Sequence, residues 1–184
     1  MSLPRIEGYA VISREGMIAE ADGSFPEAIK VEADQIFYHA ALARADAIAN
    51  GRHSAEVLPF SAERPRLVLT RRVATLKADP RKPHVINWNP AGAPFTEAWR
   101  ALHLDHGTLA VVGGTDVFGV FLAVGYDSFF LSRTPGSVPN GRPVFPGVGP
   151  DFSAQELLKR EGYRLHASRV LDVPTNTILE EYIR

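Results

Sequence analysis

The stretch 109–122, Leu-Ala-Val-Val-Gly-Gly-Thr-Asp-Val-Phe-Gly-Val-Phe-Leu, constrains the fold of this chain more than any other. Its first four residues are all apolar and predict a strand that is buried on both faces. Gly113 and Gly114 then open a helix whose apolar residues are Val117, Phe118, Phe121 and Leu122. Such a turn presents backbone N–H groups and the positive end of the helix dipole at the edge of a sheet. The turn therefore predicts either a phosphate or nucleotide site or a tight connection.

Strands and helices alternate over the first two thirds of the chain. Further strands are predicted at 8–13, 66–70, 84–88 and 128–132. The segment 45–50 has helical propensity but ends at the turn signal Asn50-Gly51, and its residues alone leave both structures open. The segments 163–172 and 177–183 predict an antiparallel hairpin. We therefore expect an α/β fold with a mostly parallel sheet and an antiparallel C-terminal hairpin.

Three more segments predict helices. The first covers 27–44 and places Ile36, Ala40 and Ala43 on its inward face, with Phe37, Ala41 and Leu42 beside them. The second begins at Thr96 as N-cap and runs to about residue 103. The third begins at a capping box formed by Ser153 and Glu156 and stops at Gly162. Between 135 and 150 the chain is rich in proline and glycine and predicts a surface loop.

Composition excludes several classes of protein. The 184 residues, 45% of them hydrophobic, predict one domain over 1–184. A formal net charge of −1 is not typical of proteins that bind nucleic acid or anionic membranes. Cysteine is absent and the six histidines lack ligand spacing, so we expect no disulfide and no metal. With no signal-peptide or membrane-spanning pattern in the sequence, we expect a cytoplasmic protein.

Three stretches, in order and spacing, resemble the dihydrofolate reductase superfamily. Asn50-Gly51-Arg52-His53-Ser54 resembles that family's Gly-Arg-x-Thr/Ser signature, and Val112-Gly113-Gly114-Thr115-Asp116-Val117-Phe118 resembles its Gly-Gly turn and following helix. Residues 128–132 with Arg142-Pro143-Val144-Phe145-Pro146 resemble its next strand and phenylalanine-proline segment. Segments 13–19 and 45–48 are closer to the C-terminal reductase domain of the bifunctional riboflavin-biosynthesis deaminase/reductase. The resemblance implies a three-layer dihydrofolate reductase-like fold and makes 45–50 a strand.

This resemblance implies that the chain binds NADPH. Residues at the matching positions beside the nicotinamide are Ala10, Val11 and Ile18. Those that match the phosphate and adenosine positions are Gly51, Arg52, His53, Ser54, Thr70, Arg71 and Arg72, with Arg52 as the cation for the 2′-phosphate. Those that would cover the pyrophosphate and the nicotinamide ribose are Val112, Gly113, Gly114, Thr115, Asp116, Val117 and Phe118. Asp116 departs from many relatives, since an acid here repels phosphate unless it points away or caps the helix.

The resemblance also implies a substrate site. Asp34 falls within one residue of the spacing of the helix acid that binds the substrate ring and is the candidate catalytic residue, with a bound water as the alternative proton donor and a solvated helix acid as the other interpretation. Tyr38 lies one turn on, where it could stack on the ring or belong to the core. Tyr9 stands where the riboflavin-type domain has lysine, and Phe25-Pro26 stands where dihydrofolate reductases have tryptophan-proline. Arg64 lies near the position of a folate-tail arginine and is otherwise a solvated loop residue.

We therefore expect an NADPH-dependent reductase similar to 5-amino-6-(5-phosphoribosylamino)uracil reductase. It would transfer a hydride to a small pyrimidine- or pterin-type substrate, and the resemblance implies a homodimer. A true dihydrofolate reductase and a non-catalytic nucleotide-binding module of the same fold are the alternatives. No nucleic acid or membrane partner is expected.

Overall fold

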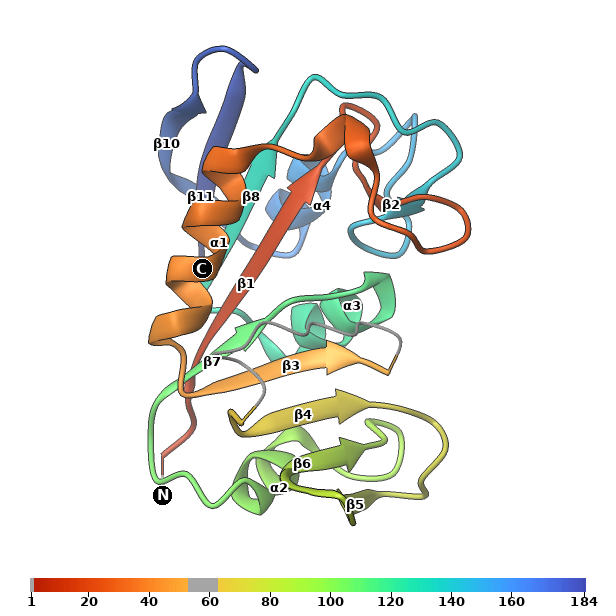
Figure 1. Cartoon of the computed structure of the whole chain (residues 1–184), viewed down its shortest axis with the longest axis vertical. Helices are drawn as coiled ribbons and strands as arrows, with labels where there is room; N and C mark the ends of the chain where they lie inside the picture. Colours follow the sequence, from red (N-terminus) through yellow and green to blue (C-terminus); the bar gives the residue numbers. More distant parts are fainter. Residues whose placement is uncertain (1, 53–62) are drawn as a thin grey trace.

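The computed structural model describes residues 2–52 and 63–184. These residues contain a nine-stranded sheet (Figure 1). In spatial order its strands are β10 (Arg164–Asp172), β11 (Thr177–Ile183), β8 (Ser128–Arg133), β1 (Arg5–Ile12), β7 (Thr108–Val111), β3 (Ala47–Gly51), β4 (Arg66–Leu69), β6 (Lys82–Trp88) and β5 (Leu76–Asp79). All neighbours from β8 to β6 are parallel. The pairs at the two ends are antiparallel, so the predicted mostly parallel sheet with a C-terminal hairpin is confirmed.

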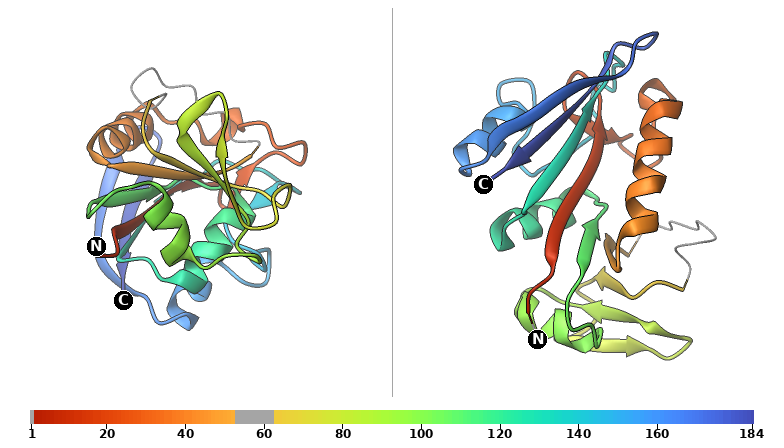
Figure 2. Two further views of the ribbon diagram at one scale, coloured as in Figure 1. Left: turned by 90° about the horizontal axis from the view of Figure 1, so that it is seen from below. Right: turned by 90° about the vertical axis from the view of Figure 1, so that its left-hand side faces the viewer.

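Helices cover both faces of this sheet. Figure 2 shows α1 (Glu32–Arg44) on one face and α3 (Thr115–Val124) and α4 (Ala154–Arg160) on the other. The buried side chains of α2 (Phe95–Ala101) belong to the same core as those of α3 and α4. A small sheet of β2 (Met17–Ala19) and β9 (Arg142–Pro143) and a 3-10 turn, η1 (Glu27–Ile29), complete the described elements. The predicted three-layer fold is confirmed.

The strand β7 lies at the centre of both cores, as its apolar sequence predicts. Leu109, Ala110 and Val111 have no exposed surface. Leu109 and Val111 pack in the larger core under α2, α3 and α4, whereas Ala110 packs with Leu42 under α1. Both faces of β7 are covered by helices, so the position of its carboxyl end is fixed. The Gly113-Gly114 turn that follows therefore lies at a defined place on the sheet edge.

Helix α1 differs from the prediction in its start and in its buried face. Pro26 to Lys30 forms a 3-10 turn, Val31 is extended, and the α-helix begins at Glu32 instead of residue 27. The predicted inward residues Ile36, Ala40 and Ala43 are exposed, whereas Asp34, Ala41 and Leu42 are buried. An alanine-rich helix offers two stripes of similar hydrophobicity, and packing against the sheet selects the stripe that contains Leu42.

Other local predictions are partly confirmed and partly wrong. The ambiguous segment 45–50 forms β3, as the resemblance implies. Thr96 is not an N-cap, because Pro94 takes that position and α2 begins at Phe95. The capping box of α4 is confirmed, with the Ser153 side chain accepting from the Glu156 N–H. The strand β5 was not predicted. No helix in the described residues is long and apolar enough to cross a membrane.

Candidate active-site cleft

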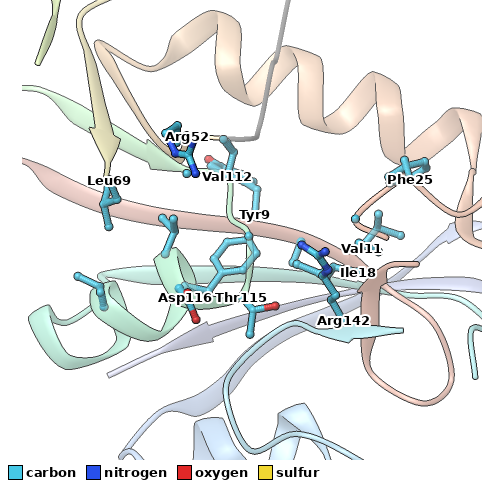
Figure 3. A pocket seen from close by; sticks show the side chains of 18 of the residues that line it. Tyr9, Val11, Ile18, Phe25, Arg52, Leu69, Val112, Thr115, Asp116 and Arg142 are labelled. Carbon is cyan, nitrogen blue, oxygen red and sulfur yellow. The ribbon is translucent and has the colours of Figure 1, made fainter. Parts of the chain in front are cut away.

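A cleft of about 1280 Å³ opens at the carboxyl ends of the parallel strands (Figure 3). Its lining comes from the ends of β1, β3 and β4, the turn after β7, the first turns of α3, the strand β2 and the inner face of α1. These segments are far apart in the sequence. They meet here because parallel strands bring all their carboxyl ends to one edge of the sheet.

The structure brings most residues assigned to the cofactor into this cleft. Those that line it are Ala10, Val11, Ile18, Gly51, Arg52, Thr70, Arg71, Arg72, Val112, Gly114, Thr115, Asp116, Val117 and Phe118. Gly113 lies beneath them, where its carbonyl accepts a hydrogen bond from the Gly51 N–H at 3.0 Å. His53 and Ser54 lie outside the described residues. The proposed nucleotide residues thus form one continuous surface.

The Gly113-Gly114 turn is shaped for close approach of a ligand to the backbone. Gly113 has a φ of +91°, and a Cβ there would lie 2.7 Å from the Phe118 ring. Gly114 is the N-cap of α3, and a Cβ on it would meet nothing within 4 Å. The first position therefore requires glycine, and the second leaves open space in front of the helix N-terminus.

Two contacts fix the beginning of α3. The Thr115 hydroxyl donates to the carbonyl of Pro143 on β9, so this hydroxyl ties α3 to the small sheet. Asp116 points to Arg71 at the end of β4, with 3.7 Å between the carboxylate Oδ2 and Nη2, and both side chains are exposed. The cation offsets the acid's charge next to the helix N-terminus. The departure at Asp116 is thus compatible with an anion in this cleft.

The other end of the cleft holds a buried acid. Asp34, on the inner face of α1, is 9% exposed and accepts a hydrogen bond from the Ser132 hydroxyl. Burial raises the pKa of Asp34 above its ordinary value, and the Ser132 hydrogen bond and the nearby His39 oppose this only in part. Ser132 was missed by the sequence reasoning, because a serine within a strand carries no signal until the topology places that strand beside α1.

Aromatic side chains line the same cleft as the acid. Tyr9, Phe37, Tyr38 and Phe130 all line the cleft. The rings of Tyr9 and Phe130 stack with centroids 5.1 Å apart, and Phe37 packs against both. A flat heterocycle fits such a surface, because stacked and edge-on ring contacts add to the free energy of burial. Tyr38 and Phe130 are partly exposed and could contact a substrate ring, whereas Tyr9 is only 5% exposed and mainly supports Phe130 from the core.

The hydroxyl of Tyr9 is already engaged in a hydrogen bond within the protein. It donates to Glu7 Oε2 at 2.5 Å, and Glu7 is also paired with Arg5 at 2.7 Å. Burial and the hydrogen bond to Glu7 raise the pKa of Tyr9 far above the usual tyrosine range. Tyr9 therefore offers its ring to the cleft, and its hydroxyl does not replace the lysine amine of the riboflavin-type domain.

Arg64 has neither of the roles considered for it. Its guanidinium donates to the backbone carbonyls of Ala43 and Ala45. Carbonyls at the end of a helix have no partner within the helix, and a cation there is favourable. Arg64 thus closes the C-terminus of α1 and stays out of the cleft lining. The described residues contain no group of three or more histidine, aspartate or glutamate side chains that could hold a metal ion.

No protein-family model and no curated protein matches the chain. A diaminohydroxyphosphoribosylaminopyrimidine deaminase/5-amino-6-(5-phosphoribosylamino)uracil reductase from Thermotoga maritima is similar in structure, with TM-score 0.65 and 17% identity over 98% of this chain. The chain spans 56% of that longer protein.

Two solved structures of similar length also match. A protein assigned to riboflavin biosynthesis from Shewanella sp. PV-4 has TM-score 0.63 and 18% identity, with 98% of each chain covered. Dihydrofolate reductase from Enterococcus faecalis, solved with NADP(H) and RAB-propyl, has TM-score 0.64 and 16% identity over 97% of this chain and 95% of its own. At these identities the matches show a common fold.

Proposed function

We propose that this chain, which has the fold of the dihydrofolate reductase-like superfamily, is an NADPH-dependent reductase that transfers a hydride to a pyrimidine- or pterin-type substrate. In this it would resemble 5-amino-6-(5-phosphoribosylamino)uracil reductase. One observation carries the proposal: a single cleft joins an open Gly-Gly turn at a helix N-terminus to a buried acid and to a group of aromatic side chains.

The cleft residues fit a dinucleotide. The open space at Gly114 lets the pyrophosphate approach backbone N–H groups, and the α3 dipole favours its charge. Arg52 and Arg72 supply cations at the adenosine end, beside the Arg71–Asp116 pair, and a guanidinium there can bind a 2′-phosphate through two parallel hydrogen bonds. Val11 and Ile18 give an apolar surface for the nicotinamide. NADPH, when bound, supplies the hydride.

The chain's own part in the reaction is orientation and proton handling. The partly exposed ring of Phe130, which stacks on the buried ring of Tyr9, would hold a flat substrate ring against the nicotinamide site and so exclude water from the reacting atoms. Asp34 is placed to accept hydrogen bonds from ring N–H groups. Because burial raises its pKa, Asp34 can also hold a proton more readily than an exposed aspartate and donate it to the substrate nitrogen next to the carbon that accepts the hydride, which leaves Asp34 as a carboxylate.

A true dihydrofolate reductase is the second candidate. The specific observation in its favour is the acid on the inner face of α1, next to a hydroxyl from β8 at the bottom of the cleft. This candidate requires turnover of dihydrofolate and inhibition by antifolates, whereas the first requires reduction of a ribosylaminopyrimidine.

Titration with NADPH and NADH tests the proposal. We expect tight, salt-sensitive binding of NADPH and weaker binding of NADH. Arg52→Ala should weaken NADPH about 10- to 100-fold and leave NADH nearly unchanged, since a hydrogen bond to a charged group is worth about 1.5–3 kcal/mol. Arg100→Ala is the matched control, because this exposed arginine of α2 does not line the cleft. No binding of either nucleotide would exclude the reductase.

A further inference from the structure

Arg142 is a cleft residue that neither the cofactor nor the acid site accounts for. It lies on β9, opposite Ala19 of β2, and it lines the cleft. Figure 3 shows it beside Ile18 and Val11, at the end of the cleft away from Arg52 and Leu69. The cations assigned to the nucleotide are thus at one end, and Arg142 is at the other, next to the site assigned to the nicotinamide.

The guanidinium of Arg142 is held in position by the neighbouring turn. Its Nε donates to the Ala21 carbonyl at 3.1 Å, and the group packs on Gly23, where a Cβ would lie 3.0 Å from Nη1. The turn is itself closed by hydrogen bonds of 2.9 Å from the Glu20 N–H to the Ser24 carbonyl and from the Gly23 N–H to the Glu20 carbonyl. An arginine anchored through Nε keeps its two Nη groups aligned as a pair of donors.

No acid of the described residues forms an ion pair with this donor pair. Asp22, on the same turn, accepts hydrogen bonds from the Ser24 N–H at 2.8 Å and from the Ser24 hydroxyl at 2.6 Å, and these bonds, with a smaller contribution from the charge of Arg142, lower the pKa of Asp22. Within the described chain, no carboxylate lies within 4.0 Å of Arg142. Arg142 is exposed at the wall of the cleft and is anchored through its Nε, and a guanidinium in such a position is suited to bind an anion from outside the protein.

We propose that Arg142 is a specificity-determining residue that binds an anionic substituent of the substrate, a phosphate or a carboxylate. This inference rests on the proposed function. A substrate ring that contacts Asp34 and faces Ile18 would extend its substituent past Arg142 and Phe25. Two sources carry the required charge: the phosphate of a ribosylaminopyrimidine and the carboxylates of a glutamyl pterin. Either group would form paired, charge-assisted hydrogen bonds with the guanidinium.

Matched substrates test this role. Arg142→Gln is compared with wild type on a phosphoribosylaminopyrimidine and its dephosphorylated form, and on dihydrofolate and a dihydropterin without the glutamate. We expect kcat/KM for the anionic member of one pair to fall about 10- to 100-fold, mainly through KM. The neutral member and the Kd of NADPH should stay unchanged. The pair that responds identifies the anion as phosphate or carboxylate.

Two variants control the comparison. Arg100→Gln removes an exposed arginine of α2 away from the cleft and should change neither pair. Arg142→Lys keeps the charge without the planar fork and should restore part of the lost affinity. Equal losses on anionic and neutral substrates would refute the proposal, as would weaker NADPH binding in Arg142→Gln, which would assign the residue to the cofactor.

Fragment binding separates this inference from the proposed function. Ribose 5-phosphate and p-aminobenzoylglutamate are titrated into wild type and Arg142→Gln, with and without NADPH. Salt-sensitive binding of one fragment that Arg142→Gln abolishes supports the anion site even in a chain that binds no NADPH, in which case the reductase proposal alone fails. Fragment binding that is absent from wild type, or equal in both proteins, overturns the anion site whatever NADPH does.

Discussion

Replacing Glu15 by glutamine is expected to loosen the loop that leads from β1 to β2. Each carboxylate oxygen of Glu15 accepts two hydrogen bonds. Oε1 accepts from Arg14 Nε at 2.8 Å and Ser137 Oγ at 2.7 Å, and Oε2 accepts from Ser13 Oγ at 2.7 Å and the Val138 N–H at 2.8 Å. A glutamine has one acceptor oxygen and must turn its NH2 group toward one of these pairs of donors. The substitution therefore breaks part of the network in either orientation.

The magnitude follows from the number of bonds and their exposure. Hydrogen bonds to a charged group contribute about 1.5–3 kcal/mol each, and the Glu15 side chain is 25% exposed, so water replaces part of the loss. We expect the free energy of unfolding to fall by about 2 kcal/mol. For a chain of 184 residues this corresponds to a fall of about 4–8 °C in Tm.

The loss of stability in Glu15→Gln depends on pH. Burial by itself raises the pKa of Glu15, but the hydrogen bonds from Val138, Arg14, Ser137 and Ser13 outweigh it and leave the pKa well below its usual range. A lowered pKa gives stability that is present above the unfolded pKa of about 4.3 and is lost as the pH falls through the folded pKa. The stability difference between wild type and Glu15→Gln should therefore be largest at neutral pH and shrink in acid.

Urea unfolding across this pH range, together with NADPH titration, measures both consequences. The turn supports Met17 and Val138, whose small core packs against Val11 in the cleft, so Glu15→Gln should also weaken NADPH. Glu156→Gln is the control, because this carboxylate caps α4 away from the cleft and should alter stability alone. A difference that stays constant in acid, or unchanged NADPH affinity, would refute the reasoning.

Two further substitutions test the role of Asp34 and the packing of β1 at Gly8. Asp34→Asn should lower turnover about 10²- to 10⁴-fold, as loss of a proton-transfer group does. Because burial raises the pKa of Asp34, its charge destabilises the folded state at neutral pH and this penalty disappears below the unfolded pKa of about 3.9. The asparagine variant should therefore be at least as stable as wild type at neutral pH, and urea unfolding that shows it less stable would contradict this. Gly8→Ala should cost about 1–3 kcal/mol, since a Cβ there would lie 2.3 Å from the Phe129 ring. Gly149→Ala, with nothing within 4 Å of its Cβ, is the control in the same melts, and equal stability of the two alanine variants would refute the clash.

The end of the cleft that holds the Gly113-Gly114 turn could be predicted because its signals are local. An unbroken apolar run can be buried only where both faces are covered, and Leu109 to Val111 is fully buried. The turn at Gly113, the capping box at Ser153 and the C-terminal hairpin depend on residues within one turn or one pair of adjacent strands. Such patterns are complete in a few consecutive residues, so the sequence by itself determined them.

The end of the cleft that holds Asp34 was decided by contacts between distant segments. Asp34 meets Ser132 only because β8 lies beside β1 under α1, and Arg142 reaches the cleft only because β9 pairs with β2. The buried face of α1 was likewise decided by tertiary packing, which left Ile36 63% exposed. Pairing between distant strands leaves no periodic signal in either strand. The order of the strands in the sheet therefore determined which side chains face the buried acid.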